Sequence, residues 1–201
     1  MSTDNRNRPV FIDGPRVYLT PLQESDAETL FRWINDHNTR GRLANRGAMS
    51  MEAEVEWIRN GNDARGVNLG IMKKVTEGPD EFIGTIGALK IDMLDRTCEI
   101  GINVGDPSAR GQGFGPESTM ILLNYLFNWR NMRKARWHAY APNTPSHKCA
   151  EKCGFQVEGV LKREVFLDGD YVDVTNFTIF DEDFRPLWEK FQTENKESRM
   201  R

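Results

Sequence analysis

Hydrophobic and polar positions along the chain follow two patterns. Where apolar or β-branched residues alternate with polar ones we expect strands, and where apolar residues recur at every third or fourth position we expect helices. The expected strands are 17–22, 67–73, 82–93, 96–104 and 134–140, followed by a terminal hairpin in 165–180 that turns at Asp168-Gly169. The expected helices are 25–36, a second one capped by Ser50, then 116–130 and 146–153.

This order of elements predicts a mixed α/β domain rather than a series of βαβ units. The sequence contains no repeat and no interior linker, so we expect one domain over 10–192, with loose tails at 1–9 and 193–201. Three tryptophans on apolar helical faces, Trp33, Trp57 and Trp129, are expected in the core.

The composition narrows the class of protein. The 201 residues are 38% hydrophobic and 28% charged, which is typical of a soluble globular domain. A formal net charge of -3 argues against a nucleic-acid partner, and no apolar run is long enough to span a membrane. The N-terminus lacks the apolar segment of a secretory signal, and the odd number of cysteines argues against a disulfide framework. We therefore expect a cytoplasmic protein with no membrane or nucleic-acid partner.

A glycine-rich loop lies between an expected strand and an expected helix. It reads Arg110-Gly111-Gln112-Gly113-Phe114-Gly115-Pro116-Glu117. Its glycines allow a tight turn that points several N–H groups to one place, and the helix start adds positive potential. We place Pro116 at the first helical position. The loop therefore predicts a pyrophosphate site, although a purely structural turn is the simpler alternative. A P-loop is excluded because no Lys follows the glycines, and a dinucleotide fingerprint fits poorly because its third Gly is absent.

The loop also matches a pattern of Arg or Gln, two residues, Gly, one residue, and Gly or Ala. Together with further motifs in the same order, it makes residues 15–180 resemble the GNAT superfamily of N-acetyltransferases, in particular the branch that contains the Rim-type ribosomal-protein enzymes and the spermidine acetyltransferases. The further motifs are Cys98-Glu99-Ile100-Gly101-Ile102, Asn143-x-x-Ser146, Glu151-Lys152-Cys153-Gly154-Phe155, Glu158-Gly159 and Asp168-Gly169-Asp170-Tyr171-x-Asp173.

This resemblance implies a mostly antiparallel central sheet with a V-shaped split between two central strands, and acetyl-coenzyme A as the co-substrate. It also implies which residues bind the coenzyme. These are the backbone of Ile102, Asn103 and Val104, the loop residues Arg110, Gly111, Gln112, Gly113, Phe114 and Gly115, and Asn143.

The resemblance also suggests two catalytic residues. Glu99 matches a position that serves as the base in some members, and in a closed cleft its pKa would rise toward neutrality. A structural, paired glutamate is an equally good interpretation. Ser146 matches the position that protonates the leaving sulfur in the Rim-type branch, although a Ser that opens a helix is commonly a cap. Many members use a Tyr where this chain has Ala150, so solvent is an alternative acid.

The acceptor side carries weaker signals. Arg40, Arg42 and Arg46 indicate an acidic or phosphate-bearing acceptor, or else a solvated basic loop. Three glutamates on the second helix keep a polyamine acceptor open; they are Glu52, Glu54 and Glu56. His138 is a reserve base or a contact for the acceptor. Cys149 and Cys153 lie one turn apart near His147, but no fourth ligand has a suitable spacing, so we expect no metal.

We therefore expect direct acetyl transfer from acetyl-coenzyme A to a primary amine, with a protein N-terminus as the preferred acceptor. The alternatives are a small amine, such as a polyamine, amino sugar or antibiotic, and a non-catalytic acyl-coenzyme A sensor. A homodimer through the exposed terminal hairpin is a further expectation.

Overall fold

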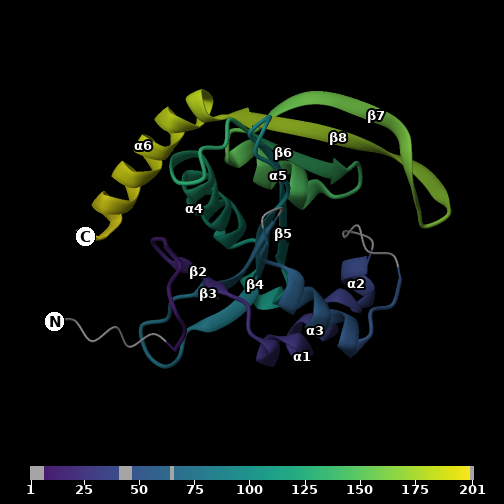
Figure 1. Cartoon of the computed structure of the whole chain (residues 1–201), viewed down its shortest axis with the longest axis horizontal. Helices are drawn as coiled ribbons and strands as arrows, with labels where there is room; N and C mark the ends of the chain where they lie inside the picture. Colours follow the sequence, from purple (N-terminus) through teal and green to yellow (C-terminus); the bar gives the residue numbers. More distant parts are fainter. Residues whose placement is uncertain (1–6, 41–46, 64–65, 200–201) are drawn as a thin grey trace.

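The strands form a single twisted sheet. The computed structural model describes residues 7–40, 47–63 and 66–199, and these residues form eight strands in the order β1-β2-β3-β4-β5-β6-β8-β7 (Figure 1). The described neighbours are antiparallel except β5 and β6, which are parallel. The mixed, mostly antiparallel sheet is therefore confirmed. The strands are β1 (Ile12–Asp13), β2 (Val17–Pro21), β3 (Val67–Lys73), β4 (Glu81–Asp92), β5 (Thr97–Val104), β6 (Lys134–Tyr140), β7 (Gln156–Leu167) and β8 (Asp170–Phe180).

Six α-helices and two short 3-10 turns accompany the described part of the sheet. The α-helices are α1 (Ala27–Ile34), α2 (His37–Arg40), α3 (Met51–Asn60), α4 (Phe114–Asn128), α5 (Thr144–Lys152) and α6 (Asp181–Arg199), and the turns are η1 (Glu24–Asp26) and η2 (Pro107–Ala109). None of the helices in the described residues is long and apolar enough to cross a membrane.

Helix starts follow local capping chemistry. Ser50 caps α3 as expected, because its side chain accepts a hydrogen bond from the N–H of Ala53 over 3.2 Å. Helix α4 begins at Phe114, two residues before the expected start at Pro116, because Gly113 takes the left-handed conformation and becomes its N-cap. Pro116 still costs no hydrogen bond, since the first four N–H groups of a helix have no intrahelical acceptor.

Described residues in both expected tails take part in helices or contacts. Helix α6 continues to Arg199, beyond Gln192, where we expected the domain to end. At the other end, within the expected tail, the guanidinium of Arg8 lies 2.8 Å from the carboxylate of Asp26.

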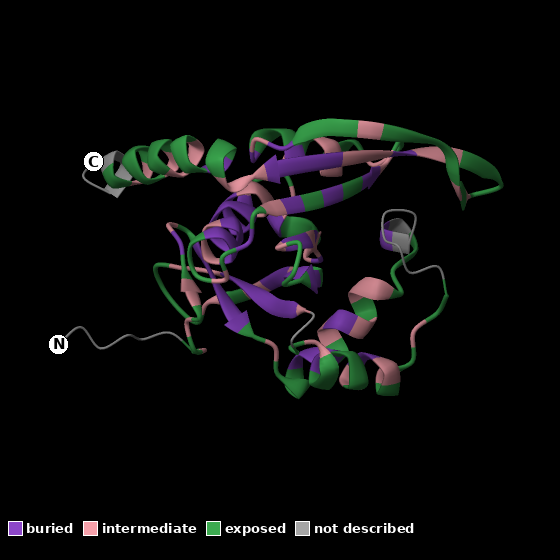
Figure 2. Cartoon of the chain, turned by 45° about the horizontal axis from the view of Figure 1, so that its top comes forward, coloured by how far each residue is buried: buried purple, intermediate pink, exposed green. Residues whose placement is uncertain are grey.

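The main hydrophobic core lies between the sheet and α4, which packs on β1, β2, β4 and β5 and is largely buried (Figure 2). Trp129 lies outside this core, and 80% of it is exposed. The reason is that α4 ends at Asn128, so Trp129 leaves the apolar face of the helix.

A second, smaller cluster joins α1 and α3. Trp33 of α1 packs against Phe82 of β4, with 5.2 Å between the ring centroids. The indole of Trp33 also lies directly on Gly105, where a Cβ atom would be only 2.1 Å from the ring. Gly105 therefore fixes the position of α1 against the end of β5.

We expect the substitution Gly105→Ala to lower the free energy of unfolding by about 1–3 kcal/mol, because the new methyl group must displace the Trp33 ring. Urea unfolding followed by circular dichroism measures this loss. Gly101→Ala is the matched control, since its Cβ would meet only the Leu89 side chain at 3.8 Å. Equal stabilities of the two variants would show that the contact with Trp33 does not hold α1 in place.

Candidate active site

The central strands β5 and β6 diverge after three residue pairs. Their parallel pairing joins 97–99 to 134–136 and stops there. Beyond Glu99, β5 stays paired with β4 as far as Val104, and β6 stays paired with β8 as far as Tyr140. The second edge of 101–104 therefore presents its backbone groups to the space between the strands. This confirms the V-shaped split, and it places the backbone of Ile102, Asn103 and Val104 along one wall.

The glycine-rich loop lies between β5 and α4. Gly111 and Gly113 adopt positive φ angles of 77° and 85°, which side chains other than Gly rarely adopt. Within the described ranges, the N–H groups of 111–115 have no backbone acceptor, and no side chain caps the helix. An anion at this helix start would meet those N–H groups and the positive end of the helix dipole. The loop therefore fits a pyrophosphate chemically.

Helix α5 packs beside the first turn of α4. A Cβ atom on Gly115 would lie 3.5 Å from Cys149 Sγ and 3.9 Å from side-chain atoms of Ile102 and Val104. Gly115 thus allows the loop, the end of β5 and α5 to approach one another closely. Phe114, next to it, is buried in the core.

Arg110 is bound to the end of β5. Its Nε donates to the carbonyl oxygen of Val104 and its Nη2 to that of Gly105, each over 2.9 Å. Its Nη2 also lies 3.5 Å from the hydroxyl of Thr39 in α2. The guanidinium therefore joins the loop to the diverging strand and to the N-terminal helices.

Glu99 lies at the point of divergence, between two basic groups. Its Oε2 is 2.8 Å from Lys90 Nζ and 3.3 Å from His138 Nε2, and the Glu99 side chain is 21% exposed. On the other side of the imidazole, His138 Nδ1 lies 2.6 Å from Asn176 Oδ1. Because an amide oxygen only accepts, Nδ1 carries a proton, and Nε2 is the nitrogen that titrates against Glu99.

The expected rise in the pKa of Glu99 is wrong. The hydrogen bond from His138, followed by the one from Lys90, outweighs the effect of burial and lowers the pKa of Glu99 to about 2. The same contact with Glu99 raises the pKa of His138. Glu99 is therefore the fixed charge of the pair. Lys90 has no sequence signal for this contact, because it reaches Glu99 from a left-handed position, φ 49°, in an irregular part of β4.

Ser146 does not open its helix. Asn143 is the N-cap of α5, and its side chain accepts from the N–H of Ser146 over 3.3 Å. The hydroxyl oxygen of Ser146 accepts a hydrogen bond of 2.9 Å from Trp137 Nε1 in β6. Indole is only a donor, so the hydroxyl proton of Ser146 is left to donate elsewhere. Capping is therefore the role of Asn143, and the structure leaves Ser146 chemically capable of giving a proton.

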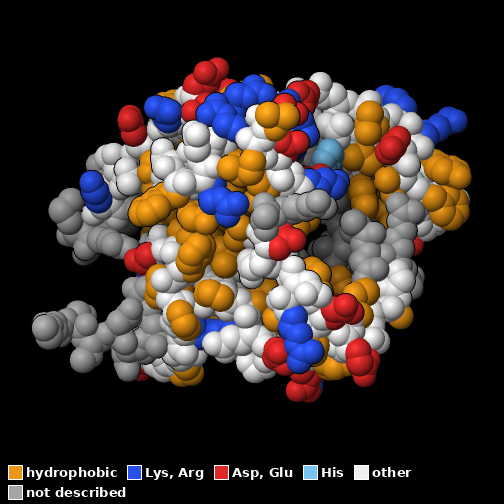
Figure 3. All heavy atoms as spheres, viewed as in Figure 1, with side chains coloured by type: hydrophobic (Ala, Val, Ile, Leu, Met, Phe, Trp, Pro, Cys, Tyr) orange, Lys and Arg blue, Asp and Glu red, His pale blue; other side chains and the backbone are white. Residues whose placement is uncertain are grey.

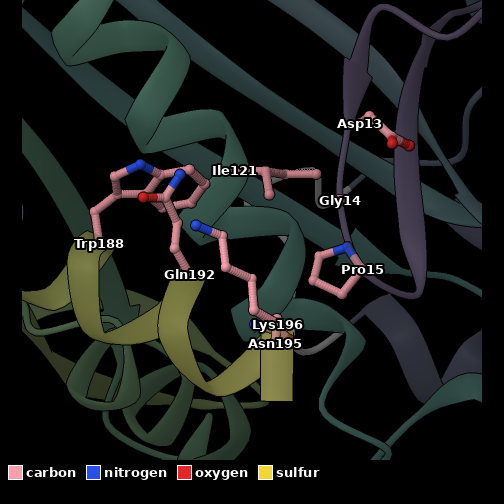
Figure 4. Close-up of a pocket in the computed structure, with 8 residues that line it drawn as sticks. All are labelled: Asp13, Gly14, Pro15, Ile121, Trp188, Gln192, Asn195 and Lys196. Atoms are coloured by element: carbon pink, nitrogen blue, oxygen red, sulfur yellow. The ribbon is translucent and has the colours of Figure 1, made fainter. Parts of the chain in front are cut away.

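The other predicted site residues are more scattered. Arg40 ends α2, whereas Arg42 and Arg46 lie outside the described residues. Cys153 Sγ lies 3.6 Å from the carbonyl oxygen of Pro116, and the described residues contain no group of three metal-ligating side chains. A cavity of about 220 Å³ lies between α6, α4 and the residues before β2. Figure 4 shows the residues that line it. None of the predicted site residues lines it.

Comparison with known proteins identifies the family of this chain. The acetyltransferase (GNAT) domain family matches residues 16–156. The uncharacterized N-acetyltransferase p20 of Bacillus licheniformis is 31% identical over 173 residues, which cover 84% of this chain and 95% of p20.

Solved structures of acetyltransferases share this fold. Spermidine N-acetyltransferase from Vibrio cholerae, in complex with CoA and spermine, aligns with a TM-score of 0.76 at 23% identity and covers 84% of this chain and 98% of its own. RimL, the ribosomal L7/L12 alpha-N-protein acetyltransferase, in complex with coenzyme A, gives a TM-score of 0.75 at 19% identity, with coverages of 86% and 98%. At these identities the structures establish the fold. The chain belongs to the GNAT family and is an N-acetyltransferase that uses acetyl-coenzyme A.

Proposed function

We propose that this enzyme acetylates the α-amine of a protein N-terminus by direct transfer, with the Glu99–His138 pair and Ser146 handling the protons. The supporting observation is the charge balance at the point where β5 and β6 diverge. Lys90 and His138 both contact the carboxylate of Glu99. An acceptor with several positive charges would meet two basic groups there, whereas the single amine of a peptide needs only one proton acceptor.

The glutamates of α3 support this preference. Glu52 is exposed, and hydrogen bonds to its own backbone N–H and to Ser50 lower its pKa. Glu54 is only 5% exposed, and this burial raises its pKa. Glu56 shares the exposed face with Glu52, opposite Glu54. The three carboxylates therefore do not form the common site that a polyamine would need.

The proton transfers follow from the contacts. In the neutral imidazole, Nδ1–H donates to Asn176, and Nε2, which lies 3.3 Å from Glu99 Oε2, carries the lone pair. We assign to His138 Nε2 the proton that the amine loses as nitrogen bonds to the acetyl carbon. The resulting imidazolium is stabilised by the charge of Glu99. Ser146 then supplies a proton to the sulfur, whose bond to the acetyl carbon breaks. Ser146 regains a proton from solvent, and the imidazolium of His138 returns its proton to solvent.

We also propose that the protein is cytoplasmic. The three cysteines are free thiols, which suits a reducing compartment and supports the cytoplasm.

The substitution Glu99→Gln tests the pair directly. Removing the carboxylate removes the first cause of the raised pKa of His138, so that pKa should fall. In kinetics, the limb of the pH profile that depends on His138 should move to lower pH. In stability, the pair strengthens the folded state where Glu99 is ionised and His138 is protonated. This contribution is lost as the pH rises through the pKa of His138, and also as the pH falls through the pKa of Glu99, about 2.

NMR titration of the imidazole Cε1 protons measures the shift without an activity assay. The native protein, titrated under the same conditions, is the control. An unchanged pKa of His138 in the variant would refute the proposed coupling with Glu99.

A panel of acceptors tests the substrate. We expect thiol release from acetyl-coenzyme A with peptides that have a free N-terminus, at a kcat/KM at least about tenfold above that for spermidine. The same peptides with a blocked N-terminus and no lysine are the matched control and should not react. A higher kcat/KM for spermidine or an amino sugar would establish the small-amine alternative. Coenzyme binding without turnover of any amine would indicate a sensor.

We also propose that the chain forms a homodimer through β7. This strand is an edge of the sheet, and its exposed apolar side chains include Val157, Val160, Leu161 and Phe166. Hydrophobic side chains also gather over the projecting β7–β8 hairpin in Figure 3. An exposed apolar edge strand is a surface that proteins usually cover.

Sedimentation velocity tests the dimer. We expect the native chain to sediment as a dimer and Val160→Glu to sediment as a monomer. Leu94→Glu is the control, because Leu94 is 93% exposed in the turn after β4, outside the hairpin. A monomeric native chain would refute the dimer.

A further inference from the structure

A buried carboxylate joins the start of β2 to the first turn of α4. Glu117 is 5% exposed, and its Oε1 accepts from the N–H of Arg16 over 2.6 Å and from the N–H of Val17 over 3.0 Å. Its Oε2 accepts from Arg16 Nε over 2.7 Å. These three bonds hold the backbone and the side chain of Arg16 against a helix that begins about a hundred residues later in the chain.

The guanidinium of Arg16 then reaches back over the glycine-rich loop. Its Nη1 donates to the carbonyl oxygen of Gln112 over 3.1 Å, and its Cζ lies 4.8 Å from the centre of the Phe114 ring. A Cβ atom on Gly113 would lie 3.2 Å from its Nη2. The planar group therefore lies along the loop from Gln112 to Glu117.

The contact with Gln112 has a consequence on the opposite side of the loop. In a planar trans peptide the C=O and the next N–H point in opposite directions. Since the carbonyl of Gln112 points to Arg16, the N–H of Gly113 points away from Arg16. This N–H is one of those for which the described residues provide no backbone acceptor.

Without this contact the peptide would have other orientations open to it. The Gln112–Gly113 peptide rotates through ψ of Gln112 and φ of Gly113, and Gly113 occupies the left-handed region at φ 85°. Glycine crosses between backbone regions at little steric cost, so Gly113 permits rotation of this peptide. An anion site made of N–H groups then needs something that holds them in place before the anion arrives.

We propose that Arg16 is a positioning residue for the coenzyme: it fixes the Gln112–Gly113 peptide so that the N–H of Gly113 points to the pyrophosphate. This inference rests on the proposed pyrophosphate site and is independent of the acceptor. Arg16 acts through the backbone of the loop and touches neither reacting atom. Lys is a poor substitute, because a single ammonium cannot make the contacts with Glu117 and Gln112 in the fork geometry of a guanidinium.

The test compares two acetyl donors that share a thioester. Acetyl-coenzyme A contains the pyrophosphate, and acetyl-pantetheine does not. We expect Arg16→Gln to raise the KM for acetyl-coenzyme A about tenfold with little change in kcat, and to leave kcat/KM for acetyl-pantetheine unchanged. Arg16→Lys should give a smaller rise with the same selectivity. All of these rates are measured as thiol release, with the amine that reacts fastest in the acceptor panel.

Arg59→Gln is the matched control. Arg59 also pairs through its Nε with a carboxylate, that of Glu24 at 2.8 Å, but it lies in α3 and does not contact the loop. This variant should behave as the native enzyme with both donors. Thermal unfolding of each variant shows whether it is folded at the assay temperature, and the Lys variant serves if the Gln variant is not.

The possible outcomes separate the proposals. An equal loss with both donors would mean that Arg16 supports only the fold, and no loss with either would mean that the loop holds itself; each would overturn the inference. If the native enzyme fails to prefer acetyl-coenzyme A to acetyl-pantetheine, the pyrophosphate site itself is wrong. A selective loss with acetyl-coenzyme A supports the positioning role of Arg16.

Discussion

The divergence of β5 from β6 is the constraint on which the rest of this structure depends. Each strand has an antiparallel neighbour on its outer side, β4 for β5 and β8 for β6, and each follows that neighbour after the parallel pairing ends at Glu99. Backbone groups in the interior of a protein must find partners, and those along a diverging strand lose theirs. In a family whose members use acetyl-coenzyme A, we propose that the amides of this coenzyme pair with the exposed edge.

The alternation of β5 separates the two sides of that opening. Successive side chains of a strand point to opposite faces, so Cys98, Ile100 and Ile102 share one face, and Glu99 shares the other with Gly101 and Asn103. Cys98 and Ile100 are buried in the main core. The approach of Ile102 to Gly115 places the start of α4 on the same face. The glycine-rich loop and the Glu99–His138 pair therefore belong to opposite faces, and the opening between the strands is where a thioester and an amine from those faces can meet.

Local signals made much of this fold predictable. The bounds of β3 and β6 agree with the expected strands, and Ser50 caps its helix as its residue type suggests. Helix α6 is absent from the expected elements, although Phe184, Leu187, Trp188 and Phe191 recur at helical spacing, and only its last part, from 193 onward, falls in the expected tail. The start of α4 was misplaced because the preference of Pro for the first turn does not fix its position within that turn, whereas the left-handed Gly113 does.

The chemistry of the site was less predictable because it depends on contacts between distant segments. The motif around Glu99 locates the carboxylate, but its pKa is set by Lys90, in an irregular part of β4, and by His138, on a strand that enters the sheet from the far side of the split. Neither partner has a sequence signal that connects it with Glu99. Two nearby cations make a carboxylate a better fixed charge than a proton acceptor, so the same position that serves as a base in some family members is better suited here to supporting a neighbouring imidazole. In the proposed mechanism, the motif therefore specifies where the proton chemistry occurs, and the tertiary contacts decide which atom performs it.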